Sequence, residues 1–253
     1  MGTGLNTSGI ILHIPHSSTS FPSREGFVCL DLIPGEVEKL TDWHTDRIFA
    51  VPGITTLRAG FSRVFCDVER FVPDELEPMA AHGMGFYYTH TDDGRLLREE
   101  SVYKQRVKRD YYDTHHHSLA ALVNARLESE GTCCLVDCHS FADTPSRLDL
   151  DQDAARPDIC IGTDPFHTPW QLADAVDRVY RRAGYDVREN KPYRGTMVPA
   201  PHYKCDKRVM SVMIEINRRL YLQPGGVIPG AIERLQSLSA KVVDAILAVA
   251  ITV

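Results

Sequence analysis

Three stretches of the sequence share a pattern that strongly constrains the fold. Each is a short apolar run that ends in polar residues: 9–17 (Gly-Ile-Ile-Leu-His-Ile-Pro-His-Ser), 132–142 (Thr-Cys-Cys-Leu-Val-Asp-Cys-His-Ser-Phe-Ala) and 209–218 (Val-Met-Ser-Val-Met-Ile-Glu-Ile-Asn-Arg). Runs of this length and composition are typical of buried strands. In open α/β sheets, ligands bind beyond the carboxyl ends of the strands. We therefore predict that these three strand ends meet and form one site.

The rest of the chain alternates between strand and helix patterns. Helices are predicted at 36–49, at 99–130 as one long helix or two, at 170–182 and at 232–249, and shorter strands at 54–57, 63–67 and 158–163. This alternation predicts a single α/β domain over residues 1–253 with a mostly parallel central sheet. The irregular segment 73–94 is a candidate lid over the site.

Composition argues against several classes of protein. The 253 residues carry a formal net charge of -6, whereas nucleic-acid-binding surfaces are normally basic. The longest apolar run, 245–253, is too short to span a bilayer. Seven cysteines without a Cys-x-x-Cys pair, and residues 1–6 without the basic region of a signal peptide, predict a reducing, cytoplasmic location. We therefore expect a small-molecule ligand and no membrane or nucleic-acid partner.

Two histidines and an aspartate are the first candidates for a metal site. His16, Asp46 and His139 offer the nitrogen and oxygen ligands of a catalytic zinc ion, with a fourth position left for water. Each histidine follows an apolar strand, although a lone histidine there is more often a cap or a core residue. His13 is the alternative to His16, but it lies within the strand, where side chains alternate between faces. Asp42 is the alternative to Asp46, because residues four apart share one face of a helix; both can also be plain surface carboxylates.

Two further acids lie in the predicted strands. Asp137 precedes His139 by two residues, so it faces the same side and can orient the imidazole; otherwise it is a turn former. Glu215 is flanked by apolar residues, and a carboxylate there is costly to bury unless it is paired or used. Partial burial would raise its pKa into the range that suits a general base. The structural alternative is an ion pair with Arg218 or Arg219.

Arginines in the same regions are candidates for holding an anionic substrate. Arg63 and Arg70 flank the predicted strand 63–67, and Arg218 follows the third strand. A guanidinium group can bind a carboxylate through two parallel hydrogen bonds. The structural alternative to substrate binding is equally consistent with the sequence: Arg63 would pair with Asp67, and Arg70 with Glu69.

A run of three histidines, 115–117, lies in the predicted helix 99–130. Consecutive helical residues point to different faces, so at most one of the three can enter the site. We expect this residue to be His116, and either His116 or Arg218 is expected to stabilise the oxyanion.

Taken in order, these motifs resemble the N-formylglutamate amidohydrolases, also called the N-formylglutamate deformylase family. Each motif is short, but their order is specific, and they cover most of the chain. They are Ile14-Pro-His-Ser17, Asp42-Trp-His-Thr-Asp-Arg47, Ser62-Arg63 to Arg70, Tyr112 to Leu119, Asp137-Cys-His-Ser140, Asn190-Lys-Pro-Tyr193 and Glu215-Ile-Asn-Arg218 with Leu220-Tyr221.

The resemblance implies a three-layer α/β/α fold of the phosphorylase/hydrolase type, with a mixed, mostly parallel sheet, related to zinc carboxypeptidases. It implies zinc-dependent cleavage of N-formyl-L-glutamate to formate and L-glutamate in histidine breakdown. His139-Ser140 then resembles the zinc-ligand motif that follows a strand, and Glu215 resembles the base. Tyr193 and Asn217 lie in matching motifs and are implied to bind substrate.

Three departures from the family pattern leave the substrate open. The family usually has Asp-x-Asn-Arg where this chain has Asp67-Val-Glu69-Arg70, Pro-Tyr-His at 114–116, and a glycine pair at 195–196. All three lie among the residues that are expected to surround the substrate. The alternatives are therefore another N-acyl amino acid deacylase, a carboxypeptidase-like enzyme, or a non-catalytic ligand-binding relative.

Overall fold

The computed structural model describes residues 9–250. Residues 1–6, on which the expectation of no signal peptide is based, lie outside this range. The strands are β1 (Ile10–Ile14), β2 (Thr55–Arg58), β3 (Cys133–Phe141), β4 (Ile159–Gly162), β5 (Val187–Glu189), β6 (Val209–Asn217), β7 (Leu222–Gln223) and β8 (Gly226–Val227). The α-helices are α1 (Ile33–Leu40), α2 (Thr45–Ile48), α3 (Val102–Val107), α4 (Thr114–Glu130), α5 (Trp170–Arg182) and α6 (Ala231–Ala250). Short 3-10 turns lie at Leu30–Leu32, Asp74–Leu76, Pro78–His82 and Arg218–Leu220, and a π-helical segment lies at Lys108–Asp113.

The central sheet has six strands in the order β2-β1-β3-β6-β4-β5. Strands β2, β1, β3 and β6 are mutually parallel, whereas β4 runs antiparallel to β6 and parallel to β5. Every residue of β1, β3 and β6 is buried, as expected for parallel strands that are covered on both faces. The predicted mixed, mostly parallel sheet is confirmed.

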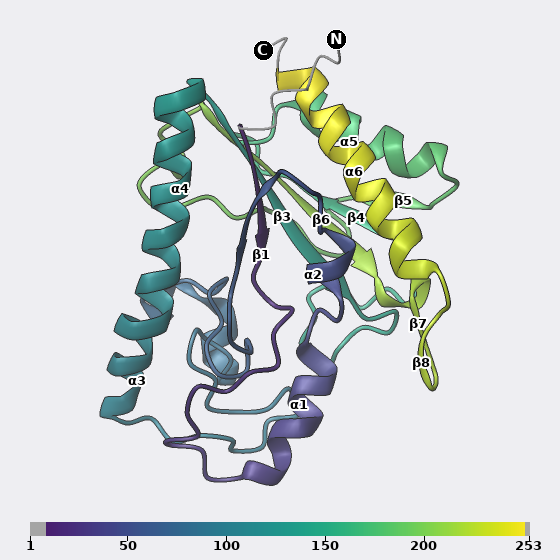
Figure 1. Cartoon of the computed structure of the whole chain (residues 1–253). Helices are drawn as coiled ribbons and strands as arrows, with labels where there is room; N and C mark the ends of the chain where they lie inside the picture. Colours follow the sequence, from purple (N-terminus) through teal and green to yellow (C-terminus); the bar gives the residue numbers. More distant parts are fainter. Residues whose placement is uncertain (1–8, 251–253) are drawn as a thin grey trace.

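Helices cover both faces of this sheet, which confirms the three-layer arrangement (Figure 1). Alternate side chains such as Val136 and Ile214 pack in one core with Leu235 of α6, on the side of α5 and α6. Their neighbour Leu135 packs on the opposite face with Val123 of α4. The period-2 alternation of the strands therefore sends one set of residues to each layer.

The predicted helix 36–49 is broken into α1 and α2. Thr41 is extended, with φ -71° and ψ 134°, and His44 adopts a left-handed backbone with φ 62°. A left-handed non-glycine residue cannot continue an α-helix. Asp42 therefore lies in the break, and it does not share a helical face with Asp46.

Two other predictions need adjustment. Residues 63–67 form a turn and not a strand, with Phe65 and Cys66 both donating backbone hydrogen bonds to the carbonyl of Ser62. The predicted helix 99–130 is continuous, but the π-helical segment separates α3 from α4. Helix α4 ends at Gly131, whose φ of 77° is readily adopted by glycine.

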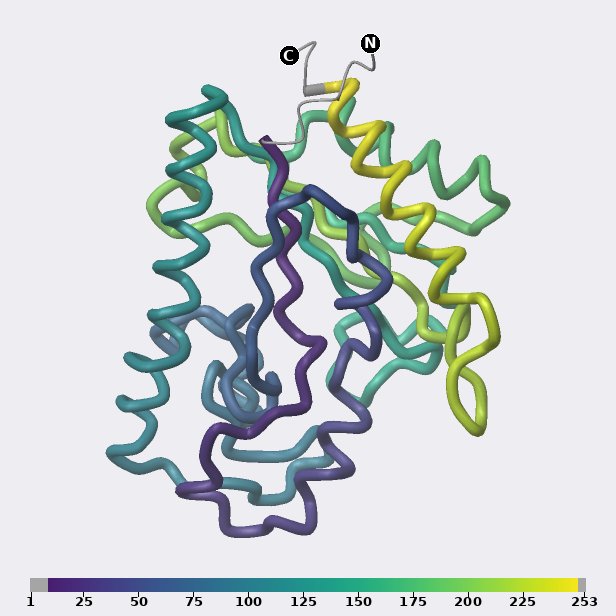
Figure 2. Tube along the Cα trace, viewed as in Figure 1, coloured from purple at the N-terminus to yellow at the C-terminus, as the bar shows by residue number. Residues whose placement is uncertain are grey.

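Residues 15–32 and 59–101 gather beyond the carboxyl ends of β1, β3 and β6, at the lower end of the view in Figure 2. Buried Arg98 ties them together by donating hydrogen bonds to the carbonyls of Tyr88 and Phe65, both at 3.0 Å. The candidate lid 73–94 includes buried Tyr87 and Tyr88, so much of it is packed against the protein. Within residues 9–250, no helix has the length and apolar character needed to cross a membrane.

Candidate active site

Three buried side chains from separate segments converge at the carboxyl end of the sheet. His16 follows β1, Asp42 lies between α1 and α2, and His139 belongs to β3. The Asp42 Oδ2 atom lies 3.1 Å from His139 Nδ1 and 3.6 Å from His16 Nδ1. The two imidazole rings are 5.1 Å apart between centroids. The structure thus brings His16 and His139 together, as the sequence predicts.

The spacing of these donor atoms fits a metal ion. Ligands held about 2.1 Å from a tetrahedral zinc ion lie roughly 3.4 Å from one another. The three atoms lie within 4.8 Å of one another, and buried His16 Nδ1 has no hydrogen-bond partner among the described residues. Two imidazole nitrogens and one carboxylate oxygen therefore form a candidate site with the composition of a catalytic metal centre.

Each imidazole has a carboxylate behind it. His16 Nε2 forms a 2.9 Å hydrogen bond with Asp67 Oδ1, whereas His139 Nε2 lies 3.1 Å from Asp137 Oδ1 without the geometry of a hydrogen bond. Metal-bound histidines commonly donate their second N–H to a carboxylate, as His16 can to Asp67, and this contact fixes the tautomer and the ring orientation. Both rings therefore present Nδ1 to the cluster and Nε2 to an acid.

Asp46 does not reach this cluster. It lies on α2, where its Oδ2 pairs with Arg58 at 3.1 Å, and about a third of its side chain is exposed. The helix break at 41–44 turns Asp42 inward and leaves Asp46 at the surface. The structure therefore brings Asp42, and not Asp46, to the two histidines.

Arg218 contacts the carboxylate oxygen of Asp42 that does not face the two histidines. Its Nη2 donates to Asp42 Oδ1 at 3.0 Å, its Nη1 donates to the Lys39 carbonyl at 2.8 Å, and its Nε lies 3.3 Å from the Ser140 hydroxyl. Burial alone would raise the pKa of Asp42, but hydrogen bonding to His139 and His16 holds it below its ordinary value. The expected oxyanion role of Arg218 is not what this geometry favours, because the guanidinium group orients a candidate ligand.

Glu215 lies beside His139, since the two residues are paired in the register of β3 and β6. Glu215 is buried, with 8% of the residue exposed to solvent. Its Oε2 atom has no hydrogen-bond partner among the described residues. Burial raises the pKa of Glu215 to about 7, with His139 opposing part of that rise. A carboxyl group with this pKa can both accept and return a proton near neutral pH.

Asp67 connects several groups at the edge of the cluster. Besides His16, it accepts hydrogen bonds from Arg63 Nε and Nη2 at 3.1 and 2.9 Å and from the Tyr88 hydroxyl at 2.8 Å, and it lies 3.4 Å from Arg70 Nε. Arg63 and Arg70 were expected to anchor substrate. Their guanidinium groups instead share this buried carboxylate, which is the structural alternative that the sequence allowed for Arg63.

The histidine run contributes a different residue from the expected one. His116 Nε2 lies 2.8 Å from the Val68 carbonyl, and burial lowers its pKa to about 4. His115 is the member of the run that contacts a candidate donor, with its Nε2 2.8 Å from Nε2 of His13. An oxyanion role for His116 is therefore not supported by its contacts.

Tyr193 and Asn217 hold the loop after β3. The Tyr193 hydroxyl donates to Asp149 at 3.0 Å, while Asn217 Nδ2 donates to Asp143 and to the Pro157 carbonyl, both at 3.0 Å. Asn217 is fully buried. Their contacts support the loop rather than a direct place on a substrate.

A second group of candidate donors lies behind His139. His13 Nδ1 is 2.9 Å from Asp137 Oδ1 and 3.3 Å from Glu69 Oε1. Burial and the neighbouring Asp137 carboxylate raise the pKa of Glu69. The sequence singled out Glu69 as a structural partner of Arg70 and as a departure from the family pattern, but not as a donor, and the run 115–117 was the only signal for His115.

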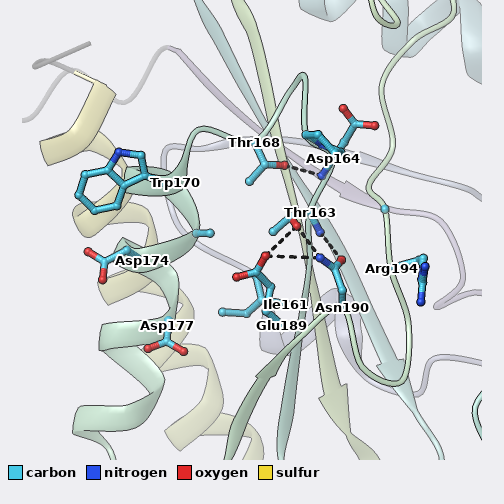
Figure 3. A pocket seen from close by; sticks show the side chains of 13 residues that line it. Ile161, Thr163, Asp164, Thr168, Trp170, Asp174, Asp177, Glu189, Asn190 and Arg194 are labelled. Atoms are coloured by element: carbon cyan, nitrogen blue, oxygen red, sulfur yellow. Dashed lines mark hydrogen bonds between the residues drawn. The ribbon is translucent and has the colours of Figure 1, made fainter.

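A separate cavity of about 930 Å³ lies beside β4, β5 and the start of α5. Thr163, Glu189, Asn190 and Trp170 are among its lining residues (Figure 3). Because β4 runs antiparallel to β6, the loops that follow β4 and β5 leave the sheet at the edge opposite to His139. This cavity is therefore distinct from the histidine–aspartate cluster.

Comparison with known proteins agrees with this architecture. The sequence profile of the N-formylglutamate amidohydrolase family matches residues 8–222. The crystal structure of N-formylglutamate amidohydrolase from Ralstonia eutropha JMP134 has a TM-score of 0.80 at 24% identity, covering 97% of this chain and 94% of that chain. Gene product Atu2144 from Agrobacterium tumefaciens has a TM-score of 0.67 at 17% identity, with the same coverage. At these identities the two structures show a shared fold.

No curated protein matches the chain. The family match alone covers most of the sequence, and its range contains all the residues of both donor clusters. The chain therefore belongs to the N-formylglutamate amidohydrolase family, and the activity that this membership supports is hydrolysis of an amide.

Proposed function

We propose that this protein is a zinc-dependent amidohydrolase that cleaves the amide of an N-acyl amino acid. N-formyl-L-glutamate is the first candidate substrate, giving formate and L-glutamate. The observation that carries the proposal is the convergence of His16 Nδ1, His139 Nδ1 and Asp42 Oδ2 beside the buried carboxyl group of Glu215.

The three donors would hold the zinc ion. Zinc bound there would polarise the scissile carbonyl and lower the pKa of a water molecule. The protein supplies the orientation, because Asp67 is hydrogen-bonded to His16, Asp137 lies against His139 and Arg218 is hydrogen-bonded to Asp42.

Glu215 is the proposed general base. With a pKa of about 7, its carboxylate form takes the proton of the attacking water, and the resulting acid returns it to the leaving amine. Its position in β6, paired with His139, keeps the carboxyl group beside the donors.

Arg63 is the proposed contact for a substrate carboxylate. Among the described residues, its hydrogen bonds come from Nε and Nη2, both to Asp67, and its side chain is 17% exposed. The Nη1 edge therefore remains for an anionic substrate. We extend the proposal to a reducing, cytoplasmic setting and a role in histidine breakdown; the seven cysteines are all free thiols.

Metal content and amine release test the proposal together. Purified protein is expected to contain zinc and to release glutamate from N-formyl-L-glutamate, and chelation is expected to abolish turnover until zinc is restored. A panel of other N-acyl amino acids and short peptides distinguishes a different deacylase from a carboxypeptidase-like enzyme. Full activity in protein freed of metal would contradict the proposed chemistry, and binding without turnover of any panel member would favour a non-catalytic relative.

A further inference from the structure

A second set of metal-type donors lies on the other side of His139. His13, Glu69 and Asp137 each direct one donor atom to the same point, and these atoms lie within 4.8 Å of one another. The separations from His13 Nδ1 are 2.9 Å to Asp137 and 3.3 Å to Glu69, close to those expected between ligands of one ion. Side-chain exposure is 0% for His13, 1% for Asp137 and 18% for Glu69.

The Glu69 carboxyl group faces two imidazoles but is not hydrogen-bonded through its Oε1 atom. Its Oε1 is buried without a hydrogen bond, since the Nδ1 of His13 is bonded to Asp137. Within residues 9–250, the ion pairs of Glu69 are with His13 and His139 only, and no lysine or arginine lies within 4.0 Å of it. Glu69 and Asp137 are adjacent buried carboxyl groups that face the same two imidazoles, those of His13 and His139. Such a pair is costly to keep unless further positive charge lies between the two carboxyl groups.

The surroundings of His13 favour a ligand role for its Nδ1 atom. Its Nε2 lies 2.8 Å from Nε2 of His115, a buried residue of α4. A ligating histidine needs a partner for its second ring nitrogen, and His115 can accept that N–H. β1 and β3 fix the geometry, because His13 and Asp137 are directly paired in the sheet.

We propose that His13, Glu69 and Asp137 bind a second divalent transition-metal ion of the Zn²⁺ or Mn²⁺ class. One imidazole and two carboxylates form the mixed nitrogen and oxygen set that such ions accept. Asp137 would join the two sites, because its Oδ1 also faces His139 Nε2 at 3.1 Å. The second ion therefore braces the carboxylate that orients a ligand of the first site. The first site does not require it, so either proposal can fail alone.

Zinc stoichiometry tests this site. Protein stripped with a chelator, reloaded with Zn²⁺ alone and desalted is expected to carry two zinc ions per chain. Glu69→Gln keeps the shape of the side chain and removes its charge, so it is expected to carry one. Asp42→Asn is also expected to carry one, and Asp46→Asn, a surface control, two.

Zinc-edge anomalous diffraction from crystals of the wild-type protein gives a second measurement, in case Glu69→Gln does not fold. Two peaks are expected, one of them among His13, Glu69 and Asp137. A single peak, or an equal zinc content in wild type and folded Glu69→Gln, would overturn the second site. If Asp42→Asn leaves the zinc content unchanged, the proposed first site fails instead.

Discussion

Replacing Glu215 with glutamine separates the stability cost of this carboxyl group from its proposed role. A carboxyl group whose pKa is higher in the folded than in the unfolded protein imposes no cost below the unfolded value, and the cost grows as pH rises through the folded value. For Glu215 these values are 4.5 and about 7. At about 1.4 kcal/mol for each pH unit between them, ionised Glu215 costs the metal-free fold roughly 3 kcal/mol above pH 7.

Metal-free Glu215→Gln is therefore expected to be more stable than the wild type by roughly 3 kcal/mol at pH 8, with the difference shrinking toward pH 5. In a chain of this length, such a gain raises Tm by about 6–12 °C. Calorimetry in chelator between pH 5 and pH 8 measures this. Glu233→Gln is the matched control, because that side chain is 65% exposed and its substitution should not change the pH profile.

The same variant, reloaded with metal, is expected to lose about 10²- to 10⁴-fold in kcat/KM. In the wild type, kcat/KM should rise with pH through an apparent pKa at or below about 7, because the base acts when deprotonated and a bound cation favours the carboxylate. A variant that is no more stable at pH 8 would refute the electrostatic reasoning. One that retains full kcat/KM with metal bound would move the base role to another residue.

Three further predictions address the ligands, their supports and the core. Asp42→Asn should weaken metal binding far more than Asp46→Asn, as measured by competition with a chromogenic chelator, and equal effects would contradict the assignment of Asp42. Asp67→Asn should lower metal affinity about 10- to 100-fold in the same assay, since it removes the negative charge that supports the His16 ring through its Nε2 atom. Ile214→Ala should lower the free energy of unfolding by about 2–5 kcal/mol in urea titrations, because the side chain is fully buried between the sheet and α6; a loss below 1 kcal/mol would contradict that packing.

The strands were predictable because their signal is local. β1, β3 and β6 are apolar runs that need cover on both faces, and the polar residues at their ends identify the edge where ligands bind. His16, His139 and Glu215 follow from that pattern alone. Their meeting required only that the three strands be parallel neighbours, as they are around β3.

The choice between Asp42 and Asp46 was beyond the reach of periodicity. It depends on one left-handed residue, His44, and a positive φ at a non-glycine residue leaves no trace in a helical pattern. The contacts of the two arginines could not be predicted for a related reason. A guanidinium group binds whichever carboxylate the fold brings near, and Asp67 reaches both Arg63 and Arg70 only because residues 63–67 form a turn.

The register of β3 against β6 links the fold to the proposed chemistry. Asp137, His139 and Glu215 point to the α4 side of the sheet, while the intervening residues Cys138 and Ile214 fill the apolar core on the α5 and α6 side. A slip of one residue would turn ionisable groups into that core and apolar groups into the site. Burial of the apolar side chains therefore selects the native register of β3 against β6. The same register places the candidate ligands and the proposed base side by side, so no additional interaction is needed to align these strands.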